Sequence, residues 1–240
     1  MAQHRAGKKE RTLQDTLVAL DSVAHRALRI HKLGGTHPHF VPVILAEVER
    51  AAACCPLFLS KDPETGRFAL AALFGFEDGE VLVEGANEGN AAFIPFHVQR
   101  QGFFASGEAI AIDMAHPRLA AGGTVPLFDP SGEPSDALRT IQRAIGAMVQ
   151  HVPPTDAFVE ALVQLRLIET VDITLTFDDG QRLSLDGLYT VSAEALAALD
   201  DDEIIRLFRK GWLQAAVVIQ ASLQNLAVLA RRRNERLAGN

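Results

Sequence analysis

The feature that most constrains the fold of this 240-residue chain is an uncharged stretch near its C-terminus. Residues 212–230, WLQAAVVIQASLQNLAVLA, carry no charge and are followed by three arginines, as in a membrane span. The stretch also contains Gln214, Gln220, Gln224 and Asn225. A side-chain amide without a partner in hydrocarbon costs about 2–7 kcal/mol. We therefore predict a helix buried in protein and no transmembrane segment.

Composition places the chain among globular proteins with a sizeable core. It has 48% hydrophobic residues, 22% charged residues and a formal net charge of −7. A general nucleic-acid binder needs a basic face for the phosphates, so we expect no nucleic-acid partner, although residues 8–11 and 231–233 are locally basic. The first twenty residues lack the apolar segment of a secretory signal, so we expect a cytoplasmic protein.

The chain has only two cysteines, and they are adjacent, at Cys54 and Cys55. A disulfide framework needs cysteines that are separated in sequence, so none is expected. We interpret the two residues as buried free thiols, and a redox pair is the alternative.

The order of the periodic segments predicts an α+β fold, with antiparallel β-hairpins mainly in the first half and around residues 171–191, packed with helices. Apolar residues at nearly helical spacing over residues 12–32 predict an amphipathic N-terminal helix within residues 1–35. Residues 36–240 are expected to form a single domain, with a sub-boundary allowed near 120–134, where turn-forming residues cluster. Further strands are predicted at 80–84, 91–95 and 109–114.

Caps and turns divide the second half of the chain. Ser135 is a candidate N-cap of a helix that His151 and the following Val-Pro-Pro end, and Thr155 would begin another helix. Asp179 and Gly180 stand between alternating runs and predict a hairpin. Further capping residues are predicted at the ends of short helices: Ser192, Asp200 and Gly211. A long buried helix would close the chain.

The stretch SKDPETGRF, residues 60–68, is the cluster that most resembles an active site. Pro63 suits the second position of a tight turn, Asp62 can cap that turn, and Gly66 can supply a positive φ angle. Lys61 and Arg67 would flank the turn in solvent. Because catalysis by such groups requires burial, we predict an exposed turn and not a catalytic centre.

Histidines offer one weak candidate for a metal centre. His37, His39, Asp113 and His116 have side chains that suit zinc or iron, although their spacing matches no metal motif. Asp113 has an alternative role as the cap of a turn. The chain contains no nucleophile elbow, phosphate-binding loop or dinucleotide fingerprint. We therefore assign no catalytic or binding residue, and no cofactor is predicted.

Several segments, read in order, resemble the SapC family, which is named from a bacterial surface-layer gene locus. The parallel segments include FVPVILAEVERAA at 40–52, PLFLSKDPETGRFALAALFGFEDGE at 56–80, IDMAHPRL at 112–119 and RKGWLQAAVVIQASLQNLAVLA at 209–230. Together the segments span about residues 22–230. The resemblance implies no catalytic residues, because the family has none established. It implies a role in nutrient uptake or peptide modification in Gram-negative bacteria, through the neighbours of SapC genes.

Three functions are compatible with these observations. The first is a non-catalytic cytoplasmic accessory protein that binds a peptide or protein partner, with the N-terminal helix and the basic C-terminal tail as docking elements. The second is an iron- or other metal-dependent oxidative enzyme that uses His37, His39, Asp113 and His116. The third is a structural protein associated with a surface layer. The sequence leans away from an enzyme and predicts no oligomeric state.

Overall fold

A computed structural model describes residues 17–33, 38–84 and 93–239, and these residues form two compact units. The first unit comprises the described part of Met1–Lys32 together with Arg100–Ile145, and the second comprises the described parts of Leu33–Gln99 and Gly146–Asn240. Helix α3 (Asp136–Gln164) passes from the first unit into the second. In the first unit, residues 100–145 associate with the N-terminal segment, and the single domain expected over residues 36–240 stays a prediction.

The first unit is built around two small antiparallel sheets. One has the order β1-β7-β6 and the other pairs β2 with β8. The elements of the unit are β1 (Leu17–Ala19), β2 (Arg29–Ile30), β6 (Phe103–Ser106), β7 (Ala109–Asp113), the 3-10 helix η3 (Pro117–Leu119), β8 (Val125–Pro126) and the start of α3. Ile30, Phe103, Ile112 and Ile141 form its core with neighbouring apolar side chains.

The prediction of an amphipathic N-terminal helix is wrong for the described residues 17–33. Residues 1–16 lie outside the described part. Strand β1 pairs with β7, so that Val18 lies opposite Ile112. The Asp21 carboxylate then accepts hydrogen bonds from the backbone N–H groups of Val23 and Ala24, which begins a turn. Val23 is 84% exposed. Strand pairing with a distant segment therefore outweighs a spacing that also fits a helix.

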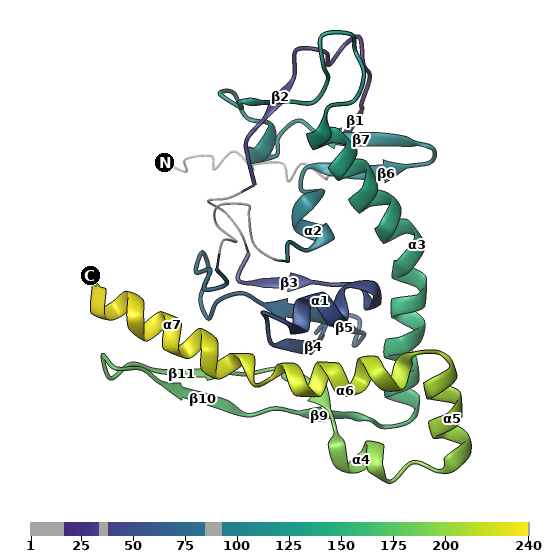
Figure 1. Ribbon diagram of the computed structural model, residues 1–240, viewed down its shortest axis with the longest axis vertical. Coiled ribbons are helices and arrows are strands. Elements are labelled where there is room, and N and C mark those ends of the chain that lie inside the picture. The colour runs from purple at the N-terminus through teal and green to yellow at the C-terminus, as the bar shows by residue number, and fades with distance from the viewer. Residues whose placement is uncertain (1–16, 34–37, 85–92, 240) are drawn as a thin grey trace, which may run out of the picture. The chain divides into compact units, whose positions relative to one another are not determined.

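The second unit contains a five-stranded antiparallel sheet with the order β3-β5-β4-β12-β9. Figure 1 labels β3, β4, β5 and β9 of this sheet. Its strands are β3 (Phe40–Pro42), β4 (Leu57–Lys61), β5 (Phe68–Leu73), β9 (Ile168–Thr170) and β12 (Leu188–Val191). A separate hairpin joins β10 (Ile173–Thr176) to β11 (Arg182–Leu185), and it turns at Gly180 with a φ of 83°. The predicted α+β class is confirmed. The predicted hairpins are confirmed as well, in the first half by β4 and β5 and around residues 171–191 by β10 and β11.

Two predicted strands are not strands. Residues 80–84 form no ladder: the Leu82 N–H donates to the carbonyl of Phe74, and Val81, Leu82 and Val83 are buried as an irregular segment. In the segment 91–95, residues 91 and 92 lie outside the described part and the remaining three form no strand. Consecutive apolar residues gave a strand-like sequence pattern in both places, and at residues 81–83 they are buried without forming a strand.

Short helices cover the second unit and follow the predicted caps. They are the 3-10 helix η2 (Leu45–Glu47), α1 (Val48–Ala52), α2 (Phe96–Gln99), α4 (Ala193–Ala197) and α5 (Asp201–Arg209). The Ser192 hydroxyl accepts from the Ala195 N–H, and the Asp200 carboxylate accepts from the Glu203 N–H. Gly211 follows α5 with a φ of 71°. These three predicted caps are confirmed.

Helix α3 does not end before its two prolines, as predicted, but continues through Pro153 and Pro154 to Gln164 (Figure 1). A proline removes the hydrogen bond to the carbonyl four residues earlier, and those carbonyls belong to Val149 and Gln150, which are exposed to water. Thr155 does not begin a new helix. Its hydroxyl donates to the His151 carbonyl at 2.6 Å and so supports the interrupted turn.

The C-terminal helical segment consists of α6 (Trp212–Ser222) and α7 (Asn225–Gly239), which follow each other closely (Figure 1). By length and composition alone Trp212–Gly239 is apolar enough to cross a membrane, as the core helices of soluble proteins also are. One face is buried along the segment, at Ile219, Ser222 and Leu229, whereas Val217 is exposed. The predicted long helix is therefore present, but it is divided near residue 223 and buried on one side.

Polar side chains in this segment bond to protein groups. The Ser222 hydroxyl accepts from the Leu57 N–H at 2.8 Å, and the Asn225 amide donates to the carbonyls of Ala52 and Cys55. These bonds hold the junction of α6 and α7 against the loop between α1 and β4. Ser222 and Asn225 thus have the protein partners that burial requires.

Candidate functional site

The stretch at residues 60–68 forms the exposed turn between β4 and β5, as predicted. The Asp62 carboxylate accepts from the N–H groups of Glu64 and Thr65 at 2.8 and 2.9 Å, and these bonds lower the pKa of Asp62. Gly66 has a φ of 70°, and its N–H donates to the Asp62 carbonyl. Lys61, Asp62 and Glu64 are all exposed, so the turn holds no solvent-shielded reactive group.

The ends of this turn line an open groove, which we call the turn groove, with a volume of about 470 Å³. Lys61, Arg67 and Phe68 form the side on the hairpin, and Asp156, Val159 and Val163 form the side on α3. The three α3 residues are spaced by three and four positions, so they lie on one helix face. Sequence reasoning missed this groove because hairpin and helix are almost a hundred residues apart.

A second groove, the α5 groove, lies on the adjacent face of α3 and has a volume of about 310 Å³. Ala157, Ala161 and Gln164 line it from α3, and Arg206, Lys210 and Trp212 line it from α5 and the start of α6. Glu160 lines both grooves. The C-terminal half of α3 is therefore a ridge with a groove on each side.

Each groove contains a lysine that lies over an aromatic ring. The Lys61 Nζ is 5.6 Å from the centre of the Phe68 ring, and the Lys210 Nζ is 4.1 Å from that of Trp212. Within the described residues, neither lysine forms an ion pair. A guanidinium nitrogen of Arg67 lies 3.7 Å from a carboxylate oxygen of Asp156, so the charges of these two residues partly neutralise each other. The lysines are thus the cations of this surface that remain available to a negatively charged ligand.

These groups suit recognition more than proton transfer. Phe68, Val159 and Val163 provide an apolar lining, and exposed charges of both signs surround it. An open surface of this kind leaves its charged groups hydrated, whereas a general acid or base is usually shifted by burial. The chemistry that the grooves offer is therefore the binding of a chain with apolar and charged side chains.

The four candidate metal ligands have separate structural partners where they are described. His37 lies outside the described residues. The His39 Nδ1 is 2.9 Å from an Asp78 carboxylate oxygen in the second unit. In the first unit, Asp113 accepts from the Ala115 N–H, as predicted for a turn cap, and the His116 Nδ1 accepts from the Arg118 N–H. Burial lowers the pKa of His116.

Over residues 17–33, 38–84 and 93–239, no three or more His, Cys, Asp or Glu side chains are grouped to hold a metal ion. Because the proposed set includes His37 and spans both units, it stays a prediction.

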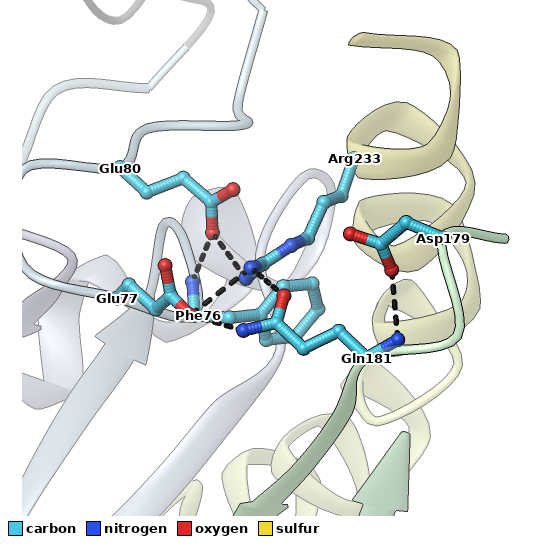
Figure 2. A network of polar contacts seen from close by, with 6 residues as sticks. All are labelled: Phe76, Glu77, Glu80, Asp179, Gln181 and Arg233. Atoms are coloured by element: carbon cyan, nitrogen blue, oxygen red, sulfur yellow. Dashed lines mark hydrogen bonds and ion pairs between the residues drawn. The ribbon is translucent and has the colours of Figure 1, made fainter. Parts of the chain in front are cut away.

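Arg233, in the arginine cluster at residues 231–233, is engaged inside the second unit (Figure 2), whereas a docking role of the basic tail stays a prediction. The Arg233 side chain, only 7% exposed, donates to Glu77 at 3.0 Å, to Glu80 at 3.4 Å and to the Gln181 side-chain oxygen at 2.7 Å. Its guanidinium lies 4.4 Å from the centre of the Phe177 ring. Arg233 thus connects α7 to the loop after β5 and to the β10–β11 hairpin.

Arg232 is also engaged within the unit. It donates to the Leu82 carbonyl at 3.0 Å and faces Glu84 at 3.7 Å. A run of arginines alone could not reveal this, because all the partners are distant in sequence. The only signal in the sequence is helical spacing: Arg233 stands four residues after Leu229 and so lies on the same face of α7.

A buried carboxylate, Glu47, holds another junction. Its two oxygens accept from the N–H groups of Ile44 and Phe96, at 3.0 and 2.8 Å. Burial raises the pKa of Glu47, against the effect of these two hydrogen bonds. Since both oxygens are occupied by backbone donors, the side chain positions the start of α2 and has a structural role.

Comparison with known proteins identifies the family but no individual relative. No curated protein matches the chain, and no solved structure matches it. The segments that resemble SapC lie between residues 22 and 230, which agrees closely with the extent of the family match. Because the SapC family model matches residues 20–229, the chain belongs to the SapC family.

Proposed function

We propose that this SapC-family chain is a non-catalytic cytoplasmic accessory protein that binds a peptide segment of a protein partner across the ridge of α3. The segment would be acidic, with aliphatic side chains that enter the turn groove. The single observation that carries the proposal is the pair of grooves, each containing a lysine over an aromatic ring and meeting at Glu160.

The apolar lining supports binding of aliphatic side chains. Val163 is 45% exposed although it stands beside Val159 and Phe68, which are at least partly buried. Covering an exposed valine with a ligand favours binding by about 25 cal/mol per Å² of apolar surface removed from water. A groove of about 470 Å³ has room for one or two such side chains.

Charge supports an acidic segment in particular. The whole chain carries a net charge of −7, so it would repel acidic partners at most of its surface. Lys61 and Lys210 stand against this trend, and within the described residues neither has a carboxylate partner. An acidic peptide would place its carboxylates at the two lysines and an uncharged residue over Glu160, where the grooves meet, and its binding would weaken as salt is raised.

Selection from a displayed library of random peptides tests the proposal with the full chain. We expect the enriched peptides to combine acidic and aliphatic residues. Val163→Glu should weaken their binding at least about tenfold, because it places a like charge in the groove lining. Lys61→Glu should weaken it as well. Val149→Glu is the matched control, since Val149 is a 63% exposed valine of the same helix outside the grooves.

Two results would overturn the proposal. The first is a selection in which no peptide is enriched over an unrelated protein. The second is a set of enriched peptides that bind the Val163→Glu and Val149→Glu variants equally well. If the selection instead supports the proposal, photo-crosslinking from position 163, with position 149 as the control, would identify the native partner in cells.

A further inference from the structure

The adjacent thiols of Cys54 and Cys55 lie at the junction of α1 and β4 and are the only two thiols of the chain. Both are free, as predicted, but burial was predicted for both and only Cys55 is fully buried; Cys54 is partly exposed. Their sulfur atoms are 3.6 Å apart, which places the two thiols in direct contact. Cys54 is therefore the more accessible residue of the pair.

This arrangement does not favour a disulfide. Disulfides usually join residues whose Cα atoms are about 4.4–6.8 Å apart. Consecutive Cα atoms across a trans peptide are only about 3.8 Å apart, so closing a bond between neighbours strains the backbone. The strain makes such a bond easy to reduce. The geometry therefore favours the dithiol over the redox pair that the sequence left as an alternative.

The 3.6 Å separation between the sulfur atoms of Cys54 and Cys55 matches that of two sulfurs bound to one central atom. With bonds of about 2.3 Å, as in metal–thiolate sites, a bond angle near 100° places the sulfurs about 3.5 Å apart. A linear two-coordinate ion with the same bonds would need about 4.6 Å. The observed 3.6 Å therefore fits a pyramidal or tetrahedral centre and not a linear one.

The number of protein ligands selects between these two geometries. A structural tetrahedral ion such as zinc takes four protein ligands. In the part of the chain that the structure describes, no third His, Cys, Asp or Glu joins the thiols to make a metal site. A pyramidal centre that brings its own third substituent needs only two thiols.

We propose that Cys54 and Cys55 form a bidentate site for a monosubstituted arsenic(III) compound, an aryl or alkyl arsenical. The arsenic forms one bond to each sulfur and loses its oxygen. Both thiol protons leave with that oxygen as water, so nothing is oxidised or reduced. The hydrogen bond between the two sulfurs lowers the pKa of the Cys54 thiol, and the charges of Arg232 and Arg50 add to this effect. The same hydrogen bond and burial raise the pKa of Cys55, so Cys54 reacts first and Cys55 gives up its proton only as the second bond forms.

Titration with phenylarsine oxide tests the site, with the intact mass of the protein as the readout. We expect one phenylarsenic group per chain, removed by a competing small dithiol. The control is the peptide of residues 51–57, AAACCPL, which has the same thiols without the fold. Because the folded chain holds the sulfurs near the bound separation, it should bind at least about tenfold more tightly than the peptide.

Two variants assign the site. Cys54→Ser and Cys55→Ser should each lose the adduct that resists competition, while circular dichroism reports whether they fold. Cys54 is partly exposed, so Cys54→Ser carries the test if the buried Cys55 does not tolerate replacement. The proposal is overturned if folded protein binds no more tightly than the peptide, or if the Cys54→Ser variant retains a stoichiometric adduct.

Discussion

Replacing Arg233 by methionine tests whether the network of Figure 2 holds the C-terminal helix in place. Methionine keeps an unbranched stem that can pack on the Phe177 ring, so the change removes mainly the charge and its hydrogen bonds. The guanidinium lies within 3.4 Å of both Glu77 and Glu80. Removing it leaves two carboxylates and the Gln181 side-chain oxygen without their shared donor.

The size of the effect follows from how deeply each partner is buried. Removing one member of a fully buried ion pair costs about 3–5 kcal/mol. Glu77 is 47% exposed and can be hydrated, whereas Glu80 is only 19% exposed and keeps just the bond from the Phe76 N–H. We therefore expect the free energy of unfolding to fall by about 2–4 kcal/mol, below the upper end of that range.

Urea unfolding followed by circular dichroism measures this change. Arg231→Met is the matched control, because Arg231 pairs with Glu235 at 3.5 Å on the exposed surface of the same helix. That variant should lose no more than about 1 kcal/mol. Adding Glu80→Gln to Arg233→Met should recover part of the loss, since it neutralises the unpaired carboxylate. Equal stabilities of the Arg233→Met and Arg231→Met variants would refute the reasoning.

Three further predictions concern stability, each measured by urea unfolding. Glu47→Gln tests the raised pKa of Glu47: the stability linked to that pKa is complete below the ordinary value of 4.5 and is lost as pH rises through the native value. The advantage of the wild type over this variant should thus be larger at pH 4 than at pH 7, and a constant difference would contradict the assignment. Thr155→Val leaves the Leu45 N–H without its 2.8 Å acceptor and should cost about 1–3 kcal/mol, whereas Thr174→Val, at an exposed strand position, should change stability little. Gly75→Ala would place a Cβ 2.1 Å from the Glu80 carbonyl oxygen and should cost at least about 1–3 kcal/mol, while Gly146→Ala meets no atom within 4 Å and should stabilise α3 by about 0.5–1 kcal/mol; similar effects of the two changes would count against the close approach at residue 75.

Local chemistry in the sequence was enough to predict many turns and helix ends. Asp62, Ser192 and Asp200 accept hydrogen bonds from N–H groups two or three residues away. Gly66 and Gly211 have the positive φ angles that their positions require. Each of these features depends on neighbours within one turn of chain, so no knowledge of the rest of the molecule was needed.

Rules of the same local kind failed where solvent or a distant strand changed the balance. Pro153 and Pro154 would end an average helix, but the carbonyls that they leave unpaired belong to exposed residues and can bond to water. Residues 17–19 belong to a spacing that fits a helix, yet they pair with a strand about ninety residues further on.

The sequence by itself thus determined the α+β class, the hairpins, several caps and the family. Only the tertiary structure decided that Arg233 is buried, that the turn at residues 60–68 faces α3 across a groove, and which side of α6 and α7 is covered. The physical reason is range. Caps and turns are stabilised by hydrogen bonds within a few residues, whereas a groove or a buried ion pair exists only when segments far apart in the chain pack together.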